Sequence, residues 1–296
     1  MSQDWADNVA QKLIRENLIQ AGTCLILGAA DTGKTTLAAA LARRLVPTRP
    51  VGIVDADIGQ SHIGPPTTVG WAVAANPLPA DLWRLPAAGI SFVGDVTPVG
   101  HLLQLTAAIT QCVRQASKAA ELIIVDTPGF ISGTVASALW WTVQHVLNPT
   151  LILAVQRENE LSDILAGLPP IESFGGRHRF NSHLELVKCS SQIRTKSPEE
   201  RRSYRQEQFN KYFCGSLLHN INLSNIAVQA TQNLSCNSPV SRIAALRNRD
   251  GVDVAIGIIK DWQVDKNIAV IRAPQLDMRE IRCLVIGDAT VDFSDS

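Results

Sequence analysis

Short apolar runs alternate with helical stretches along the first half of the chain. The apolar runs lie at residues 23–27, 51–54, 90–93, 122–125 and 151–155. Helical spacing of apolar residues follows at 35–45 and at about 101–119. Buried strands that alternate with helices predict an α/β fold, in which a doubly wound parallel sheet carries helices on both faces.

The two ends of the chain carry different patterns. Trp5, Val9 and Leu13 recur at every fourth position, which predicts an N-terminal helix within residues 1–20. Alternating strands separated by turn residues predict a small β-rich C-terminal domain at 216–296. The α/β domain is then expected at 21–215. It includes a highly charged segment at 194–213, where Ser197 and Pro198 are typical of a helix start.

Composition narrows the classes of function. The 27 Lys and Arg residues balance 27 Asp and Glu residues, and 46% of the chain is hydrophobic. This apolar content excludes a disordered chain, and the zero net charge excludes a broadly basic coat for nucleic acid. Because we find no apolar run of membrane-spanning length and no signal-peptide pattern, we expect a cytoplasmic protein without membrane contact. A loop at Arg177, His178 and Arg179 is interpreted as an exposed basic loop.

A phosphate-binding loop is predicted between the first strand and the helix that follows it. It fits the pattern G-x-x-x-x-G-K-[ST] without a mismatch and consists of Gly28, Ala29, Ala30, Asp31, Thr32, Gly33, Lys34 and Thr35, followed by Thr36. Backbone N–H groups of such a loop converge on phosphate oxygens. The Lys34 ammonium reaches the β- and γ-phosphates, and the Thr35 hydroxyl can bind Mg²⁺. The chain is therefore expected to bind a nucleoside triphosphate.

An acidic loop follows the second predicted strand. Asp55 and Asp57 lie two positions apart there, with Gly59 and Gln60 directly after them. One carboxylate can hold a metal ion while the other accepts a proton from an attacking hydroxyl. Because the carboxyl ends of parallel strands meet at one edge of a sheet, we expect this loop beside the phosphate loop. Thr35 and Asp55 are the predicted Mg²⁺ ligands.

A third loop leaves other functions open. Asp126-Thr127-Pro128-Gly129 is similar to the D-x-x-G of GTPases, which favours a regulatory GTPase switch. Such a switch requires the guanine-binding motif N-K-x-D after the fifth strand. The residues found there are Gln156-Arg157-Glu158-Asn159, which do not fit the motif and count against the GTPase interpretation. The D-T-G-K-T of the phosphate loop also occurs in dethiobiotin-synthase-like enzymes. A small-molecule kinase or ligase, and a nucleotide-binding scaffold of weak activity, are further alternatives.

Several motifs together resemble one family, the polynucleotide 5'-hydroxyl kinases related to the RNA kinase subunit of the mRNA cleavage and tRNA-splicing machinery and to the pre-ribosomal RNA-processing kinase. The acidic loop, followed by Pro65 and Pro66, resembles the family's D/E-x-D-x-G-Q…P signature. Residues 94–98 resemble its G-x-x-(S/T)-P segment. Residues 126–133 resemble its clasp, usually T-x-G-W-x-x-G, with Phe130 in place of Trp. Arg201-x-x-x-Arg205 resembles its arginine lid.

The resemblance implies transfer of the ATP γ-phosphate to the 5'-hydroxyl end of RNA or DNA, with Mg²⁺ as cofactor. It implies that Lys34, Asp57, Arg201 and Arg205 are catalytic, with Asp57 activating the hydroxyl. It also implies that the acceptor end is held by Gln60, Thr127, Gly129 and Phe130. From the charge pattern alone, Arg201 and Arg205 would be interpreted as a solvated helix face. RNA or DNA preference, ATP or GTP preference and oligomeric state stay open.

Overall fold

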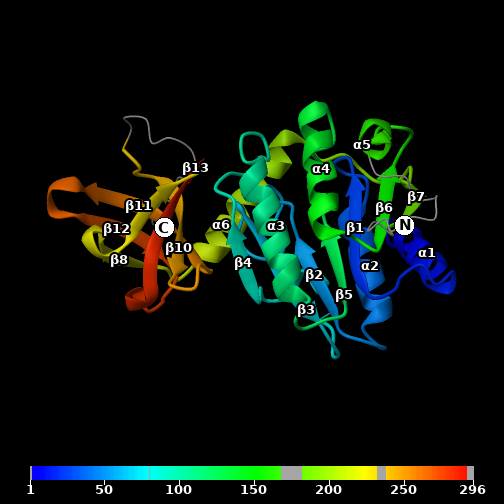
Figure 1. Cartoon of the computed structure of the whole chain (residues 1–296), viewed down its shortest axis with the longest axis horizontal. Helices are drawn as coiled ribbons and strands as arrows, with labels where there is room; N and C mark the ends of the chain where they lie inside the picture. The colour runs from blue at the N-terminus through cyan, green and yellow to red at the C-terminus, as the bar shows by residue number, and fades with distance from the viewer. Residues whose placement is uncertain (1, 80, 168–181, 232–237, 292–296) are drawn as a thin grey trace, which may run out of the picture.

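An α/β part and a β-rich part lie side by side and share one continuous sheet (Figure 1). The computed structural model describes residues 2–79, 81–167, 182–231 and 238–291. The predicted fold class is confirmed, because a mostly parallel sheet with helices on both faces is joined to a β-rich C-terminal region. The basic loop expected at Arg177, His178 and Arg179 lies outside the described residues.

Parallel strands form the centre of the α/β part. Across the sheet their order is β7 (His183–Lys188), β6 (Leu151–Gln156), β1 (Gly22–Gly28), β5 (Leu122–Asp126) and β2 (Val51–Asp55). The four inner strands of this set are almost wholly buried, which explains why they form continuous apolar runs in the sequence. Their carboxyl ends lie at one edge of the sheet.

The chain leaves β2 through a strand that the sequence pattern did not reveal. This strand, β3 (Thr68–Ala74), is antiparallel to β2, and β4 (Gly89–Phe92) is antiparallel to β3. Two reversals make β4 run in the same direction as β2. The residues after β4 therefore reach the edge of the sheet that carries the phosphate loop.

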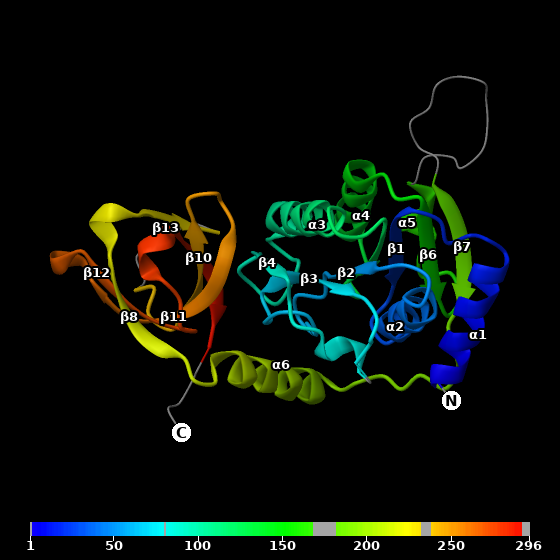
Figure 2. The ribbon, with the colours of Figure 1, turned by 90° about the horizontal axis from the view of Figure 1, so that it is seen from below.

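Helices cover both faces of this sheet (Figure 2). On one face lie α1 (Ser2–Arg15) and α2 (Lys34–Leu45), which share an apolar core that includes Leu13, Leu41 and Ile53. On the other face lie α3 (Leu102–Ala116), α4 (Thr134–Leu147) and the short α5 (Ser162–Ala166), with Ile109 and Trp140 in their core. Within the described ranges, no helix is both long enough and apolar enough to cross a bilayer.

The β-rich part continues the sheet beyond β4. Its strands are β8 (Leu217–Asn222), β9 (Ala227–Ala230), β10 (Arg242–Asn248), β11 (Asp253–Gln263), β12 (Ile268–Ala273) and β13 (Ile281–Thr290). Short 3₁₀ turns lie between its strands at Leu223–Asn225, Val264–Lys266 and Met278–Glu280. A fourth such turn, Leu82–Arg84, lies between β3 and β4 of the α/β part. Strand β11 meets β4 where Asp253 lies opposite Ile90, and the Asp253 carboxylate accepts the backbone N–H of Phe92 at 2.8 Å.

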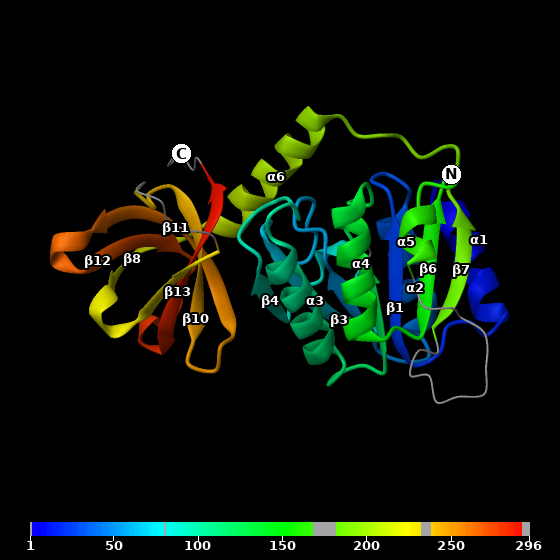
Figure 3. The same cartoon turned by 45° about the horizontal axis from the view of Figure 1, so that its top comes forward.

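One long helix, α6 (Pro198–Phe213), runs from the α/β part to the β-rich part (Figure 3). Its predicted start is confirmed. The Ser197 hydroxyl accepts the backbone N–H of Glu200, and the Glu200 carboxylate accepts the backbone N–H of Ser197. This capping box satisfies N–H groups that a helix start would otherwise leave unpaired. Phe209 and Phe213 are buried in the core of the β-rich part, so the C-terminal end of α6 is anchored there.

Candidate active site

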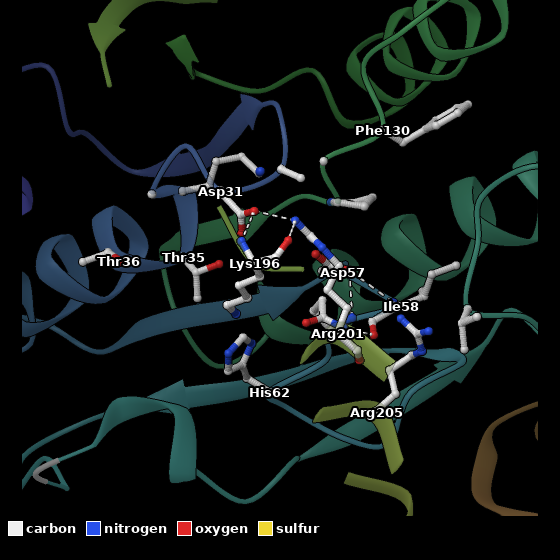
Figure 4. Close-up of a pocket in the computed structure, with 18 of the residues that line it drawn as sticks. Asp31, Thr35, Thr36, Asp57, Ile58, His62, Phe130, Lys196, Arg201 and Arg205 are labelled. Atoms are coloured by element: carbon white, nitrogen blue, oxygen red, sulfur yellow. Dashed lines mark hydrogen bonds and ion pairs between the residues drawn. The ribbon is translucent and has the colours of Figure 1, made fainter. Parts of the chain in front are cut away.

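A cavity of about 370 Å³ opens at the carboxyl edge of the sheet (Figure 4). Its walls come from the phosphate loop, the acidic loop, the segment after β4, the clasp and α6. The predicted site residues that line it are Ala30, Asp31, Gly33, Lys34, Thr35, Thr36, Asp57, Gln60, Gly129, Phe130, Arg201 and Arg205. Side chains separated by up to 175 positions in the sequence thus face one space.

The phosphate loop wraps around the Lys34 side chain. The Lys34 ammonium donates a hydrogen bond to the carbonyl oxygen of Ala29 at 2.7 Å, and the Thr32 hydroxyl donates to the same oxygen at 2.9 Å. Burial lowers the pKa of Lys34, and the negative charge of Asp126 is the largest opposing effect. Behind the loop, a Cβ at Gly28 would lie 2.4 Å from the carbonyl oxygen of Val155, so only glycine fits there.

Thr35 and Asp126 form a closely spaced pair at the start of α2. The Thr35 hydroxyl donates to Asp126 Oδ2 at 2.6 Å. Asp126 is buried, and this burial raises the pKa of its carboxyl group to about 7. Its second oxygen, Oδ1, is buried and has no hydrogen-bond partner among the described residues. A buried, unpartnered carboxylate oxygen beside a hydroxyl fits Mg²⁺, which takes one or two carboxylates together with phosphate oxygens and water.

Asp55 has a different environment from Asp126. Its carboxylate is fully buried and accepts the backbone N–H groups of Asp57, His62 and Ile63 at 3.2, 2.5 and 3.0 Å. Burial raises the pKa of Asp55 to about 7, and these hydrogen bonds oppose the shift. The contacts of Asp55 hold the acidic loop in shape. Asp126 was not among the metal ligands predicted from the sequence, although the likeness of its loop to the GTPase D-x-x-G motif carried that signal.

Asp57 and Gln60 line the cavity from the acidic loop. Asp57 Oδ1 accepts the backbone N–H groups of Gly59 and Gln60 at 3.1 and 3.0 Å. The Gln60 amide nitrogen donates to the carbonyl oxygen of Arg201 at 3.1 Å, which ties the acidic loop to α6. A Cβ at Gly59 would lie 2.8 Å from the carbonyl oxygen of Val96, so this loop also packs closely on the segment after β4.

The clasp residues divide between the sheet and the cavity. Thr127 is 1% exposed, and its hydroxyl donates to the carbonyl oxygen of Ile26 at 2.6 Å. That hydroxyl therefore joins β5 to β1. A Cβ at Gly129 would lie 2.4 Å from the backbone nitrogen of Ala30, so the clasp touches the phosphate loop there. Phe130 lies at the rim, apart from the carboxylates (Figure 4).

Helix α6, which carries the two arginines of the predicted lid, is tied to the phosphate loop by an ion pair. The Arg201 guanidinium pairs with the Asp31 carboxylate, which also accepts the backbone N–H of Lys196 at 2.9 Å. Arg205 lines the same cavity one helical turn further along α6. Burial lowers the pKa of Arg205, and the charges of Arg202 and Arg201 act in the same direction. Two arginine side chains of α6 therefore line the same cavity as Lys34.

A cluster of three tilted aromatic rings supports this wall and was not predicted from the sequence. The His62 ring lies between those of Trp83 and Tyr204, with ring centres 5.0 and 5.5 Å apart. The Tyr204 hydroxyl also donates to the carbonyl oxygen of Ser61 at 3.2 Å. Burial lowers the pKa of His62. This ring cluster joins the acidic loop to α6, and its residues carry no motif that would have identified it.

Comparison with known proteins places these loops in one family. A family model described as mRNA cleavage and polyadenylation factor CLP1 P-loop matches residues 28–215. A polyribonucleotide 5'-hydroxyl-kinase of Pyrococcus abyssi is 33% identical over 217 residues, which cover 73% of this chain and 57% of that protein. A polyribonucleotide 5'-hydroxyl-kinase of Methanocaldococcus jannaschii is 31% identical over 209 residues, which cover 70% of this chain and 55% of that protein. The chain spans little more than half the length of these relatives.

Solved structures agree on the fold. The structure of a wild-type Clp1p–Pcf11p complex superposes with a TM-score of 0.69, at 13% identity, over 96% of this chain and 77% of the matched chain. A second Clp1p–Pcf11p structure gives a TM-score of 0.70 over 96% of this chain. From the matched phosphate loop through the end of α6, the chain belongs to the CLP1 P-loop family.

Proposed function

We propose that this protein is a cytoplasmic, ATP-dependent polynucleotide 5'-hydroxyl kinase, which transfers the γ-phosphoryl group of ATP to the 5'-hydroxyl end of RNA or DNA. The observation that carries the proposal is that Asp57 faces the same cavity as Lys34 and the two lid arginines. A site with one carboxylate on the acceptor side and three cations around the phosphates suits phosphoryl transfer. The names of the curated relatives support RNA as the acceptor.

The donor ATP is assigned to the phosphate loop. Lys34 and the backbone N–H groups of the loop bind the β- and γ-phosphates. We assign Mg²⁺ to Thr35 and Asp126 in preference to Asp55, because Asp126 has a buried free oxygen beside Thr35 whereas Asp55 is engaged by three backbone N–H groups. Mg²⁺ held there would neutralise part of the negative charge of the phosphates.

The acceptor hydroxyl is assigned to Asp57. Both backbone hydrogen bonds to Asp57 fall on Oδ1, so we assign the proton to Oδ2. The 5'-oxygen attacks the γ-phosphorus while Asp57 takes its proton, and the bond to the β,γ-bridging oxygen breaks to release ADP. Arg201 and Arg205 neutralise charge on the transferring oxygens. An arginine in this role can raise the rate by about 10³-fold or more.

The clasp and Gln60 are assigned to the terminal nucleotide. Phe130 at the rim can stack on a base, which contributes about 1–3 kcal/mol. Gly129 lets the clasp lie against the phosphate loop, and Gln60 fixes the acidic loop against α6. Thr127 acts on the acceptor only through the shape of the clasp, because its hydroxyl is engaged by β1.

Label transfer tests the proposal directly. ATP labelled at the γ-phosphate is incubated with 5'-hydroxyl RNA and DNA oligonucleotides, and a 5'-phosphorylated oligonucleotide serves as the control that cannot accept. We expect label on the 5'-hydroxyl strands only, and its loss in Lys34→Ala and Asp57→Asn. GTP hydrolysis that is indifferent to oligonucleotide, with no label transferred, would refute the kinase and favour a GTPase switch.

A further inference from the structure

A second cavity adjoins the active-site cavity along α6. Its volume is also about 370 Å³, and Val96 and Arg205 line both cavities. Arg202 and Gln206 of α6 form one wall, and residues 288–291 of the β-rich part form the other. We call this second cavity the α6–β13 groove. It continues the site in the direction that leads from the α/β part to the β-rich part.

The β13 wall of the groove is fixed to the α/β part. The backbone N–H of Asp288 donates to the carbonyl oxygen of Gly94 at 2.9 Å, and a Cβ at Gly287 would lie 2.5 Å from that oxygen. His101 is 1% exposed, and its Nε2 lies 3.5 Å from Asp95 Oδ2 and 3.4 Å from Asp288 Oδ2. A buried imidazole between two carboxylates, together with this close backbone contact, holds the two walls at a defined separation.

The charges of the groove favour an anion. The two carboxylates that line the groove, those of Asp95 and Asp288, both lie beside His101. Asp288 also has the Arg242 guanidinium at 3.4 Å. Across the described ranges, neither Arg202 nor Arg205 has a carboxylate within ion-pair distance. Burial is the main cause that lowers the pKa of Arg205, and repulsion from Arg202 adds to it while the charge of Asp57 opposes it. A phosphate between them would relieve that repulsion, and arginine binds phosphate well.

We propose that the α6–β13 groove binds the backbone phosphates of the acceptor strand beyond its first nucleotide. The inference rests on the proposed function, because the first cavity must hold the 5' end. A strand whose 5'-hydroxyl reaches Asp57 passes Arg205, which lines both cavities, and continues toward Arg202. The β-rich part then contributes one wall of the acceptor site. The protein accordingly favours polynucleotides over mononucleotide acceptors.

The test compares two acceptors that differ only beyond the first nucleotide. A nucleoside 3'-phosphate ends before the groove, whereas a six-nucleotide 5'-hydroxyl RNA reaches it. Arg202→Ala should lower kcat/KM for the hexamer about tenfold more than kcat/KM for the nucleoside 3'-phosphate, since one charge-assisted contact is lost. Arg202→Glu should widen that ratio further. Arg114→Ala removes the same charge from an exposed position of α3 and should leave the ratio unchanged.

Two results separate the groove from the proposed function. Equal losses on both acceptors in Arg202→Ala and Arg202→Glu would overturn the groove while the kinase activity stands. Failure of the unmodified protein to phosphorylate either acceptor would overturn the kinase proposal, and the groove with it. Because Arg202 is exposed, we expect both variants to keep the wild-type unfolding midpoint.

Discussion

Replacing Gly129 by alanine tests the contact between the clasp and the phosphate loop. The added Cβ would lie 2.4 Å from the backbone nitrogen of Ala30 and 2.5 Å from its Cα. Non-bonded carbon atoms prefer about 3.5–4.0 Å, so the two loops must separate by about 1 Å. Both obstructing atoms belong to the backbone, and they cannot rotate aside as the end of a flexible side chain can.

A shift of that size is expected to lower kcat/KM for phosphoryl transfer by about 100-fold, because a 1 Å misplacement of reacting groups can have this effect. Initial rates of label transfer to 5'-hydroxyl RNA measure it, and titration with ADP reports whether the phosphate loop still binds. Gly167→Ala is the matched control. Its Cβ would meet only an ordinary contact, with the carbonyl oxygen of Ile164 at 3.6 Å, and its φ of −83° suits alanine.

Thermal unfolding of both variants separates a local shift from loss of the fold. The clash lies between two loops at the edge of the sheet, so we expect the Gly129→Ala protein to stay folded. Wild-type turnover and ADP affinity in that protein would refute the reasoning. They would mean that the clasp can move away from the phosphate loop without any effect on catalysis.

Three further predictions address single groups. Asp57→Asn should retain ATP binding but lose transfer by about 10²–10⁴-fold; loss of ATP binding in equilibrium titration would contradict its role as base. Burial raises the pKa values of Asp55 and Asp126 to about 7, so the folded protein binds more protons than the unfolded chain between about pH 4 and 7. The free energy of unfolding without Mg²⁺ should therefore fall as pH rises through that range, and Asp126→Asn should flatten the dependence; urea unfolding that is constant from pH 5 to 8 would contradict the shifts. Phe130→Ala should raise KM for the acceptor about tenfold, with Phe130→Trp at or below wild type; a change confined to KM for ATP would exclude stacking.

The inner sheet could be predicted because its strands are buried on both faces. Residues 122–125 and 151–155 form uninterrupted apolar runs, and such runs leave few alternatives to a central parallel strand. Strand β3 was missed because Thr68 and Gly70 interrupt its apolar pattern. Strand β7 was missed because it lies at the sheet edge and alternates apolar with polar residues. Pairing between distant strands is a tertiary effect that local patterns do not specify.

The site could be predicted only in part for a related reason. Motifs identified the loops, and strand direction predicted that they meet, but motifs do not say where each side chain points. Thr127 turns into the sheet and Asp126 turns toward Thr35, one position apart at the end of the same strand. The pairing of Asp31 with Arg201 joins residues 170 positions apart, and no local pattern reveals it.

The ion pair between Arg201 and Asp31 bears on the entropy of substrate capture. Immobilising an arginine side chain costs about 2 kcal/mol of rotamer freedom. Here that loss occurs when the protein folds, because Asp31 holds the guanidinium and also the backbone N–H of Lys196, two positions before α6 begins. In the proposed function, a phosphate bound at Arg201 would meet a preorganised cation and would replace one oxygen partner by another. Binding at this position would then require a local exchange of partners and no search by a free side chain.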